Sequence, residues 1–100
     1  MRVRSFKSAE RAAEYVTSLR KNELPGPDVA IVDYRLAGDC DGLWLSKIIE
    51  SRFPETQIIL MSSDTEANIR PREIELGIHP VFLQKPIEVD VLRRMIANKR

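Results

Sequence analysis

The sequence predicts an α/β fold in which a parallel β-sheet carries helices on both faces. Three short apolar runs support this, at Val29–Val32, Ile58–Met61 and Val81–Gln84. Each run is too short for a typical helix and does not alternate with polar residues, which is typical of strands buried on both faces. Helical segments lie between the runs, and such alternation of strand and helix favours a parallel sheet.

Two elements precede the first of these runs. Arg2–Phe6 is interpreted as a short strand. Ser8 offers an N-cap for a helix over Ala9–Lys21, because its hydroxyl can accept a hydrogen bond from the first turn. The apolar stripe of this helix has the helical spacing i, i+4, i+7. It is made of Ala12, Val16 and Leu19.

Three more helices follow the apolar runs, which makes four strands and four helices in all. The first is predicted over Leu43–Arg52 and the last over Val89–Asn98. Between them, Thr65–Leu76 is predicted to be helical only in part. Pro71 lies inside it and indicates a break or a late start, because proline cannot donate an intrahelical hydrogen bond. Gly77 is suited to its C-terminal cap.

Composition limits the function classes. The 100 residues predict a single domain, 1–100, without an output domain. Sixteen basic and fifteen acidic residues give a net charge of +1, which does not favour binding to nucleic acid or to an anionic membrane. The single cysteine, Cys40, excludes an internal disulfide, and no apolar run approaches the ~18 residues of a membrane helix. A cytoplasmic protein is expected.

Three chemically different side chains follow the three apolar runs. They are Asp33, Ser62 and Lys85. The carboxyl ends of parallel strands share one edge of a sheet, where function collects in such folds, so these groups are expected to converge. A carboxylate can accept a phosphoryl group as a nucleophile, while a hydroxyl and an ammonium group can stabilise the phosphoryl oxygens. The set therefore indicates phosphoryl chemistry.

Five segments of the chain match a known family, namely Val3–Glu10, Pro27–Leu36, Asp41–Leu43, Ile58–Ser62 and Phe82–Pro86. They resemble the receiver domain of bacterial two-component response regulators. The resemblance implies a flavodoxin-like receiver fold. It also implies a signalling role in a phosphorelay, in which Asp33 is phosphorylated by a histidine kinase or a phosphotransfer protein. The chain would then be no enzyme beyond self-dephosphorylation.

The resemblance also implies roles for individual residues. Ser62 would be the switch hydroxyl, and Phe82 the aromatic side chain whose rotamer reports activation, although a plain core role is equally expected for Phe82. Lys85 would pair with phosphoryl oxygens and precede a cis peptide bond to Pro86. X–Pro bonds are uncommonly cis, so this prediction is easily checked.

Two further positions match those that modulate phosphoryl lifetime in the family. They are Arg35, two residues after Asp33, and Asp64, two residues after Ser62. Their opposite charges could pair at the mouth of the pocket. The metal ligands implied for Mg²⁺ are the carboxylate of Asp33 and the backbone carbonyl of Arg35.

The family begins with a strand, two adjacent acidic residues and a first helix, and this chain has no matching segment. Mg²⁺ prefers oxygen ligands in octahedral geometry, so the absence of the acidic pair predicts a weak site and weak phosphorylation at Asp33. The missing strand would leave a gap in the sheet. Three explanations stay open: direct pairing of Arg2–Phe6 with Val29–Val32, a homodimer or strand exchange with a second chain, or a late start at Met1.

Two alternative functions remain. The chain could be a non-phosphorylated pseudo-receiver that acts as a protein-interaction or dimerisation module. It could also be a fragment of a haloacid dehalogenase-type phosphatase, which places Asp, Ser or Thr, and Lys at strand ends. That family needs a second Asp two residues after the nucleophile, where this chain has Arg35. The phosphatase therefore ranks last.

Overall fold

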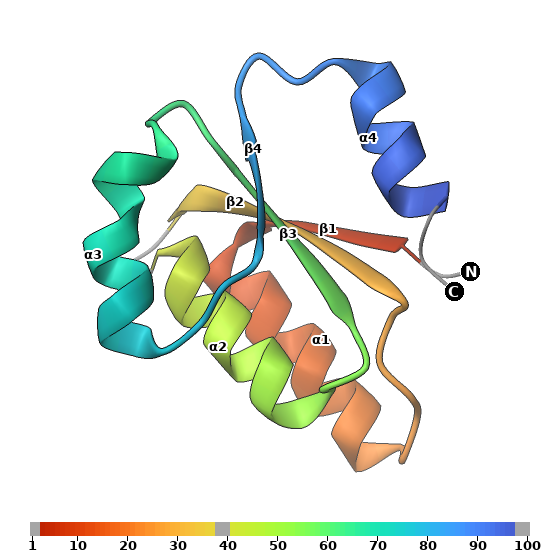
Figure 1. Ribbon diagram of the computed structural model, residues 1–100. Coiled ribbons are helices and arrows are strands. Elements are labelled where there is room, and N and C mark those ends of the chain that lie inside the picture. The colour runs from red at the N-terminus through yellow and green to blue at the C-terminus, as the bar shows by residue number, and fades with distance from the viewer. Residues whose placement is uncertain (1–2, 38–40, 98–100) are drawn as a thin grey trace.

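The computed structural model describes residues 3–37 and 41–97, so Cys40 lies outside them. Four strands and four helices alternate along this part of the chain (Figure 1). Within it, no helix is long and apolar enough to cross a membrane. The strands are β1 (Val3–Ser8), β2 (Val29–Ala37), β3 (Gln57–Ser62) and β4 (Val81–Gln84). The helices are α1 (Ala9–Lys21), α2 (Gly42–Arg52), α3 (Glu66–Leu76) and α4 (Val89–Ala97).

The four strands form one parallel sheet in the order β1-β2-β3-β4, so the flavodoxin-like class expected from the sequence is confirmed. β1 pairs directly with β2, and Val3 lies opposite Val29. Of the three explanations left open for the sheet, the structure therefore has direct pairing of the first two strands. The sheet is continuous without a strand from a second chain.

One face of the sheet carries the main core. Helices α1, α2 and α3 pack there, and Figure 1 shows α1 and α2 lying side by side beneath the strands. Alternate strand residues point to this face, because side chains alternate along a strand. The buried members are Phe6, Ala12, Val16, Ala30, Val32, Leu43, Leu45, Ile49, Ile58, Leu60, Ile69 and Ile78.

The opposite face is covered more lightly. Its buried residues are Val29, Ile31 and Ile59. The helix that covers them is α4, which lies on the far side of the sheet from α1 and α2 (Figure 1). None of the α4 side chains is fully buried. The predicted two-sided sheet is therefore strongly asymmetric. The half-buried α4 residues that contact this second cluster are Leu92, Met95 and Ile96.

The predicted break at Pro71 is wrong, because α3 runs continuously through it. The helix begins after Thr65, whose side chain accepts a hydrogen bond from the amide of Asn68. Pro71 has no amide hydrogen, so the helix loses one backbone hydrogen bond in its interior. The Thr65 cap and the burial of Ile69 stabilise the helix enough to offset this loss. Gly77 caps the other end with φ of 66°, a left-handed conformation that glycine adopts without strain.

Strand β2 continues beyond Asp33, where the apolar run ends. Its pairing with β3 does stop there, because Asp33 and Met61 are the last paired residues of the two strands. Beyond a register shift, β2 pairs with β1 again, through Ser8 and Ala37. Residues 34–37 are therefore held on one side only, which leaves Asp33 open toward the end of β3.

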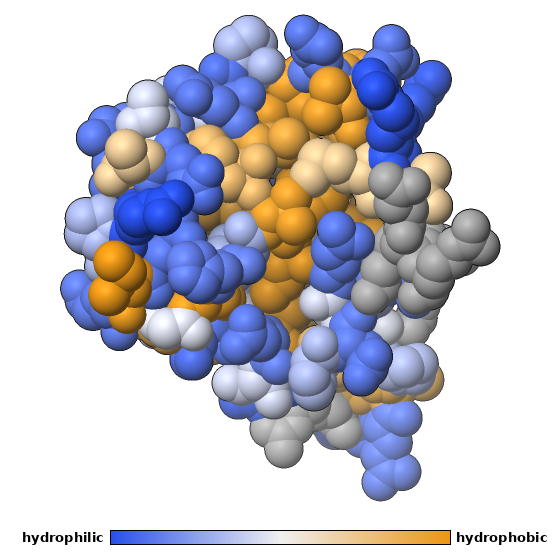
Figure 2. All heavy atoms as spheres, viewed as in Figure 1, coloured by the Kyte–Doolittle hydropathy of each residue, from blue (hydrophilic) through white to orange (hydrophobic). Residues whose placement is uncertain are grey.

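The edge strand β4 carries apolar side chains at the surface. Val81 is 36% exposed, and Phe82 and Leu83 are half-buried. Figure 2 shows this apolar surface along β4, between α3 and α4 and bordered by hydrophilic residues. The position of α3 therefore defines one side of the apolar surface on β4.

Candidate functional site

The ends of β2 and β4 bring two opposite charges into contact. Lys85 Nζ donates a hydrogen bond of 2.6 Å to Asp33 Oδ2. The Asp33 side chain is 16% exposed and that of Lys85 is 37% exposed, so a ligand can still reach both groups. The second oxygen, Oδ1, accepts a longer bond of 3.3 Å from the amide of Arg35. A partly shielded carboxylate with a bound ammonium group is thus placed at the carboxyl edge.

Ser62 lies at the end of β3, one residue beyond the strand partner of Asp33. Its side chain is almost fully buried, and its Oγ accepts a 3.0 Å hydrogen bond from the amide of Asp64. Its backbone carbonyl accepts a 2.7 Å bond from the amide of Lys85. The backbone therefore fixes Ser62 and Lys85 side by side, and both belong to the same edge as Asp33.

Arg35 and Asp64 form an ion pair, with 3.5 Å between Nη2 and Oδ2. Their side chains are 79% and 38% exposed, so the pair contributes little to stability. It does link the segment after β2 to the segment after β3. The pair expected from the sequence is therefore present, above the end of the sheet.

Two other predicted residues lie on β4 or directly after it. The peptide bond between Lys85 and Pro86 is cis. Phe82 is half-buried and packs against the main core on the face that carries α1, α2 and α3. Phe82 therefore packs as a half-buried aromatic side chain at the border of the main core.

Asp41 and Arg72 form an ion pair that was not expected from the sequence. Asp41 Oδ1 accepts a 2.9 Å hydrogen bond from the amide of Trp44 and so caps α2. Asp41 Oδ2 accepts a 2.9 Å bond from Nε of Arg72 on α3, and this contact raises the pKa of the guanidinium. The residues are 31 positions apart, and no local pattern indicates such a bridge.

The adjacent Gly42 lies very close to the backbone of β2. A Cβ atom built on Gly42 would meet the carbonyl oxygen of Asp33 at 2.4 Å and Cα of Tyr34 at 2.9 Å. Only glycine allows this approach. The start of α2 therefore rests directly on the backbone that carries the Asp33 carboxylate.

Tyr34 provides a pH test of this part of the site. Burial raises the pKa of its phenol above the ordinary value of 10.0, and the Asp41 carboxylate adds to the increase. The folded chain favours the neutral phenol, so this contribution to stability is full below about pH 10 and is lost as the pH rises through the folded pKa. In a Tyr15→Phe variant, Tyr34 is the sole tyrosine. We expect phenolate absorbance to appear at higher pH in the native than in the urea-unfolded variant.

The Tyr15→Phe substitution should leave the packing around it unchanged, because it keeps an aromatic ring at this position. The ring centroid of Tyr15 lies 5.6 Å from that of Phe6. A native midpoint equal to or below the unfolded midpoint would contradict the burial of the Tyr34 phenol.

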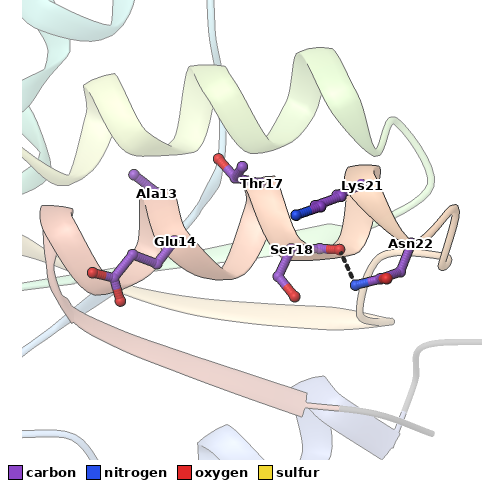
Figure 3. A pocket seen from close by; sticks show the side chains of 6 residues that line it. All are labelled: Ala13, Glu14, Thr17, Ser18, Lys21 and Asn22. Carbon is purple, nitrogen blue, oxygen red and sulfur yellow. Dashed lines mark hydrogen bonds between the residues drawn. The ribbon is translucent and has the colours of Figure 1, made fainter.

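A separate hollow of about 590 Å³ lies on α1 (Figure 3). Its lining contains none of the strand-end residues. The Asn22 side chain donates a 2.9 Å hydrogen bond to the carbonyl of Ser18, so part of its polar surface is already satisfied. The hollow is the outer surface of one helix and converges on no reactive group. Its lining residues are Ala13, Glu14, Thr17, Ser18, Lys21 and Asn22.

A family model described as the response regulator receiver domain matches residues 1–97. The chain belongs to the response regulator receiver domain family. Such domains are signalling domains of two-component systems, and the membership separates this chain from haloacid dehalogenase-type phosphatases. Among curated proteins, the receiver is 28% identical over 95 residues to the DNA-binding transcriptional regulator NtrC of Proteus hauseri. The match covers 91% of this chain but 19% of that regulator.

Solved structures share the receiver fold. The signal receiver domain of a modulated diguanylate cyclase from Desulfovibrio desulfuricans G20 has a TM-score of 0.69 at 20% identity, over 97% of this chain and 90% of that one. The BeF3-activated receiver domain of NtrC has a TM-score of 0.64 at 20% identity, over 98% and 92%. The BeF3-activated receiver domain of Klebsiella pneumoniae RstA has a TM-score of 0.60 at 20% identity, over 97% and 95%.

Receiver domains commonly bind Mg²⁺, and the residues that the structure describes do not fit this ion well. Among them, no three acidic, histidine or cysteine side chains cluster as a metal site. The oxygen donors expected from the sequence are the Asp33 carboxylate and the Arg35 carbonyl, and Asp33 Oδ2 is already bound by Lys85. Two donors fall short of the octahedral oxygen shell of Mg²⁺.

Proposed function

We propose that this receiver domain is a phosphorelay module in which Asp33 accepts a phosphoryl group from a phosphohistidine. The donor would be a histidine kinase or a phosphotransfer protein in the cytoplasm. The observation that carries the proposal is the 2.6 Å contact between Lys85 Nζ and Asp33 Oδ2. It combines a nucleophilic carboxylate with a cation that can neutralise incoming phosphoryl charge.

In the transfer, a carboxylate oxygen of Asp33 attacks the phosphorus atom. The oxygen–phosphorus bond forms while the bond from phosphorus to the imidazole nitrogen breaks, and the released imidazole takes a proton from water. Oδ1 is the freer oxygen, because its bond from the Arg35 amide is the longer of the two contacts. The side chains of Ser62 and Lys85 would then bind the phosphoryl oxygens.

We expect the transfer to be slow. In the described part of the chain, positive charge near Asp33 comes from Lys85 and from Arg35, whose side chain already pairs with Asp64. Electrostatic stabilisation of the transferred group is usually the largest contribution to such a reaction. With few groups to supply it, Asp33 would be phosphorylated only partially.

The test is incubation with acetyl phosphate and Mg²⁺, followed by mass spectrometry of the intact protein. The wild type should gain a phosphoryl group and Asp33→Asn should not. Asp28→Asn is the matched control, because Asp28 directly precedes the same strand at its opposite end. Phosphorylation of Asp33→Asn at the wild-type level, or none in the wild type, would contradict the proposal.

A second candidate function rests on the poor fit of Mg²⁺ to the edge. A receiver domain that is not phosphorylated could act as a protein-interaction or dimerisation module, and the apolar surface along β4 gives it a place to bind. Amide chemical shifts that stay unchanged with beryllofluoride and Mg²⁺ would favour this function. Light scattering would show whether the chain forms a homodimer.

A further inference from the structure

We infer that Arg72 is a positioning residue that couples the state of Asp33 to helix α3. The inference rests on the proposed role of Asp33 as the site whose charge changes. The change in charge at Asp33 would reach α3, the helix beside the apolar surface on β4, through the contact that Arg72 makes with Asp41. The route consists of the Asp33 backbone, the start of α2 and the Asp41–Arg72 bridge.

The first step of the route is steric. A Cβ atom on Gly42 would lie only 2.4 Å from the Asp33 carbonyl oxygen, which means that the two backbones are in contact. Ser46 Oγ donates a buried 2.7 Å hydrogen bond to the Gly42 carbonyl, which holds this turn of α2 in place. A displacement of the backbone at Asp33 therefore displaces the start of α2, because packed backbones cannot compress.

The second step is electrostatic. Asp41 directly precedes Gly42, and its two carboxylate oxygens bind the Trp44 amide and Arg72 Nε, both at 2.9 Å. The Asp41 and Arg72 side chains are 24% and 33% exposed, so water screens the bridge only in part. Arg72 also binds Glu75 on its own helix at 2.8 Å, which orients the guanidinium. Charge-assisted bonds of this kind are directional.

The third step concerns α3 itself. Its buried side chains are those of Ile69 and Glu73, a small area for a helix of 11 residues. A helix held by so few buried groups responds to changes in its polar contacts. Arg35–Asp64 links the segment before α3 to the same region after Asp33. That pair is exposed and precedes the helix, so Arg72 makes the more shielded contact to α3 itself.

The experiment compares amide chemical shifts with and without beryllofluoride and Mg²⁺ in the wild type, Arg72→Gln and Arg70→Gln. Arg70 is the matched control, because its ion pair is with Glu66 on the same helix. In the wild type and Arg70→Gln we expect shifts both around Asp33 and along α3. In Arg72→Gln the shifts around Asp33 should persist while those along α3 are lost. Arg72→Lys should restore part of the α3 response.

Retention of the α3 shifts in Arg72→Gln would overturn the inference. If beryllofluoride changes no amide chemical shift near Asp33 in the wild type, the proposed phosphoacceptor function fails. The coupling between Asp33 and α3 is then measured without beryllofluoride. Asp33→Asn removes the charge directly, and its effect on α3 amides is compared in the wild-type and Arg72→Gln backgrounds. If Arg72 has only a structural role, Asp33→Asn should shift the α3 amides equally in both backgrounds. The inferred coupling requires that Asp33→Asn shift them in the wild-type background and not in Arg72→Gln.

Discussion

Leu60→Ala is expected to lower the free energy of unfolding by about 2–5 kcal/mol. Leu60 is fully buried in β3, one of the two central strands, and belongs to the main core. Removing three side-chain carbons leaves a cavity between the sheet and its helices that the packed surroundings cannot fill. Urea unfolding monitored by circular dichroism would measure the loss, a large part of the stability of a small domain.

Leu92→Ala is the matched control from the other face of the sheet. Leu92 is half-buried and comes from α4, which has no fully buried side chain. The same chemical change should cost only about 1 kcal/mol there, because less apolar area is lost from the interior. A cost for Leu92→Ala equal to or above that for Leu60→Ala would show that the two faces are packed alike.

Gly42→Ala is expected to cost about 1–3 kcal/mol of stability and to disturb the site itself. The new methyl group would meet the Asp33 carbonyl and Tyr34 Cα, which are backbone atoms and cannot rotate away. Alanine normally favours a helix more than glycine does, so the sign of the effect separates close contact from helix propensity. The measurement is urea unfolding together with the amide shifts of Asp33 and Tyr34.

Gly77→Ala provides the comparison. A Cβ atom at Gly77 meets nothing within 4 Å, and its cost comes from the positive φ of 66° alone. We expect some loss of stability and unchanged shifts at Asp33 and Tyr34. If Gly42→Ala is as stable as the wild type with native shifts at Asp33, the contact between α2 and β2 is looser than described.

Much of the fold could be predicted because its elements depend on local patterns. The helix expected over Ala9–Lys21 has the bounds found for α1. The end of β2 could not be predicted, because residues 34–37 mix polar and apolar side chains in no clear pattern, and they pair with β1 alone. Pro71 shows the converse, since a local rule against a helix yields to a cap and to packing.

The candidate site divides in the same way. The convergence of Asp33 and Lys85 could be expected because parallel strands end at one edge, and the structure places these two groups in contact. The bridge from Asp41 to Arg72 could not be expected from the sequence, because it depends on where α3 lies relative to the start of α2. Gly42 gave only a weak signal, a glycine at a helix start, and its need for close approach becomes visible only beside the Asp33 backbone.

The strand order has a consequence for how the chain reaches its fold. Among the described strands, each one after β1 pairs with the strand that precedes it, so β2 can dock on β1, β3 on β2 and β4 on β3 as each is made. During synthesis, β2, β3 and β4 would each emerge after the strand with which they pair. Sequence-local pairing of this kind shortens loop closure and favours rapid folding, even in a parallel sheet.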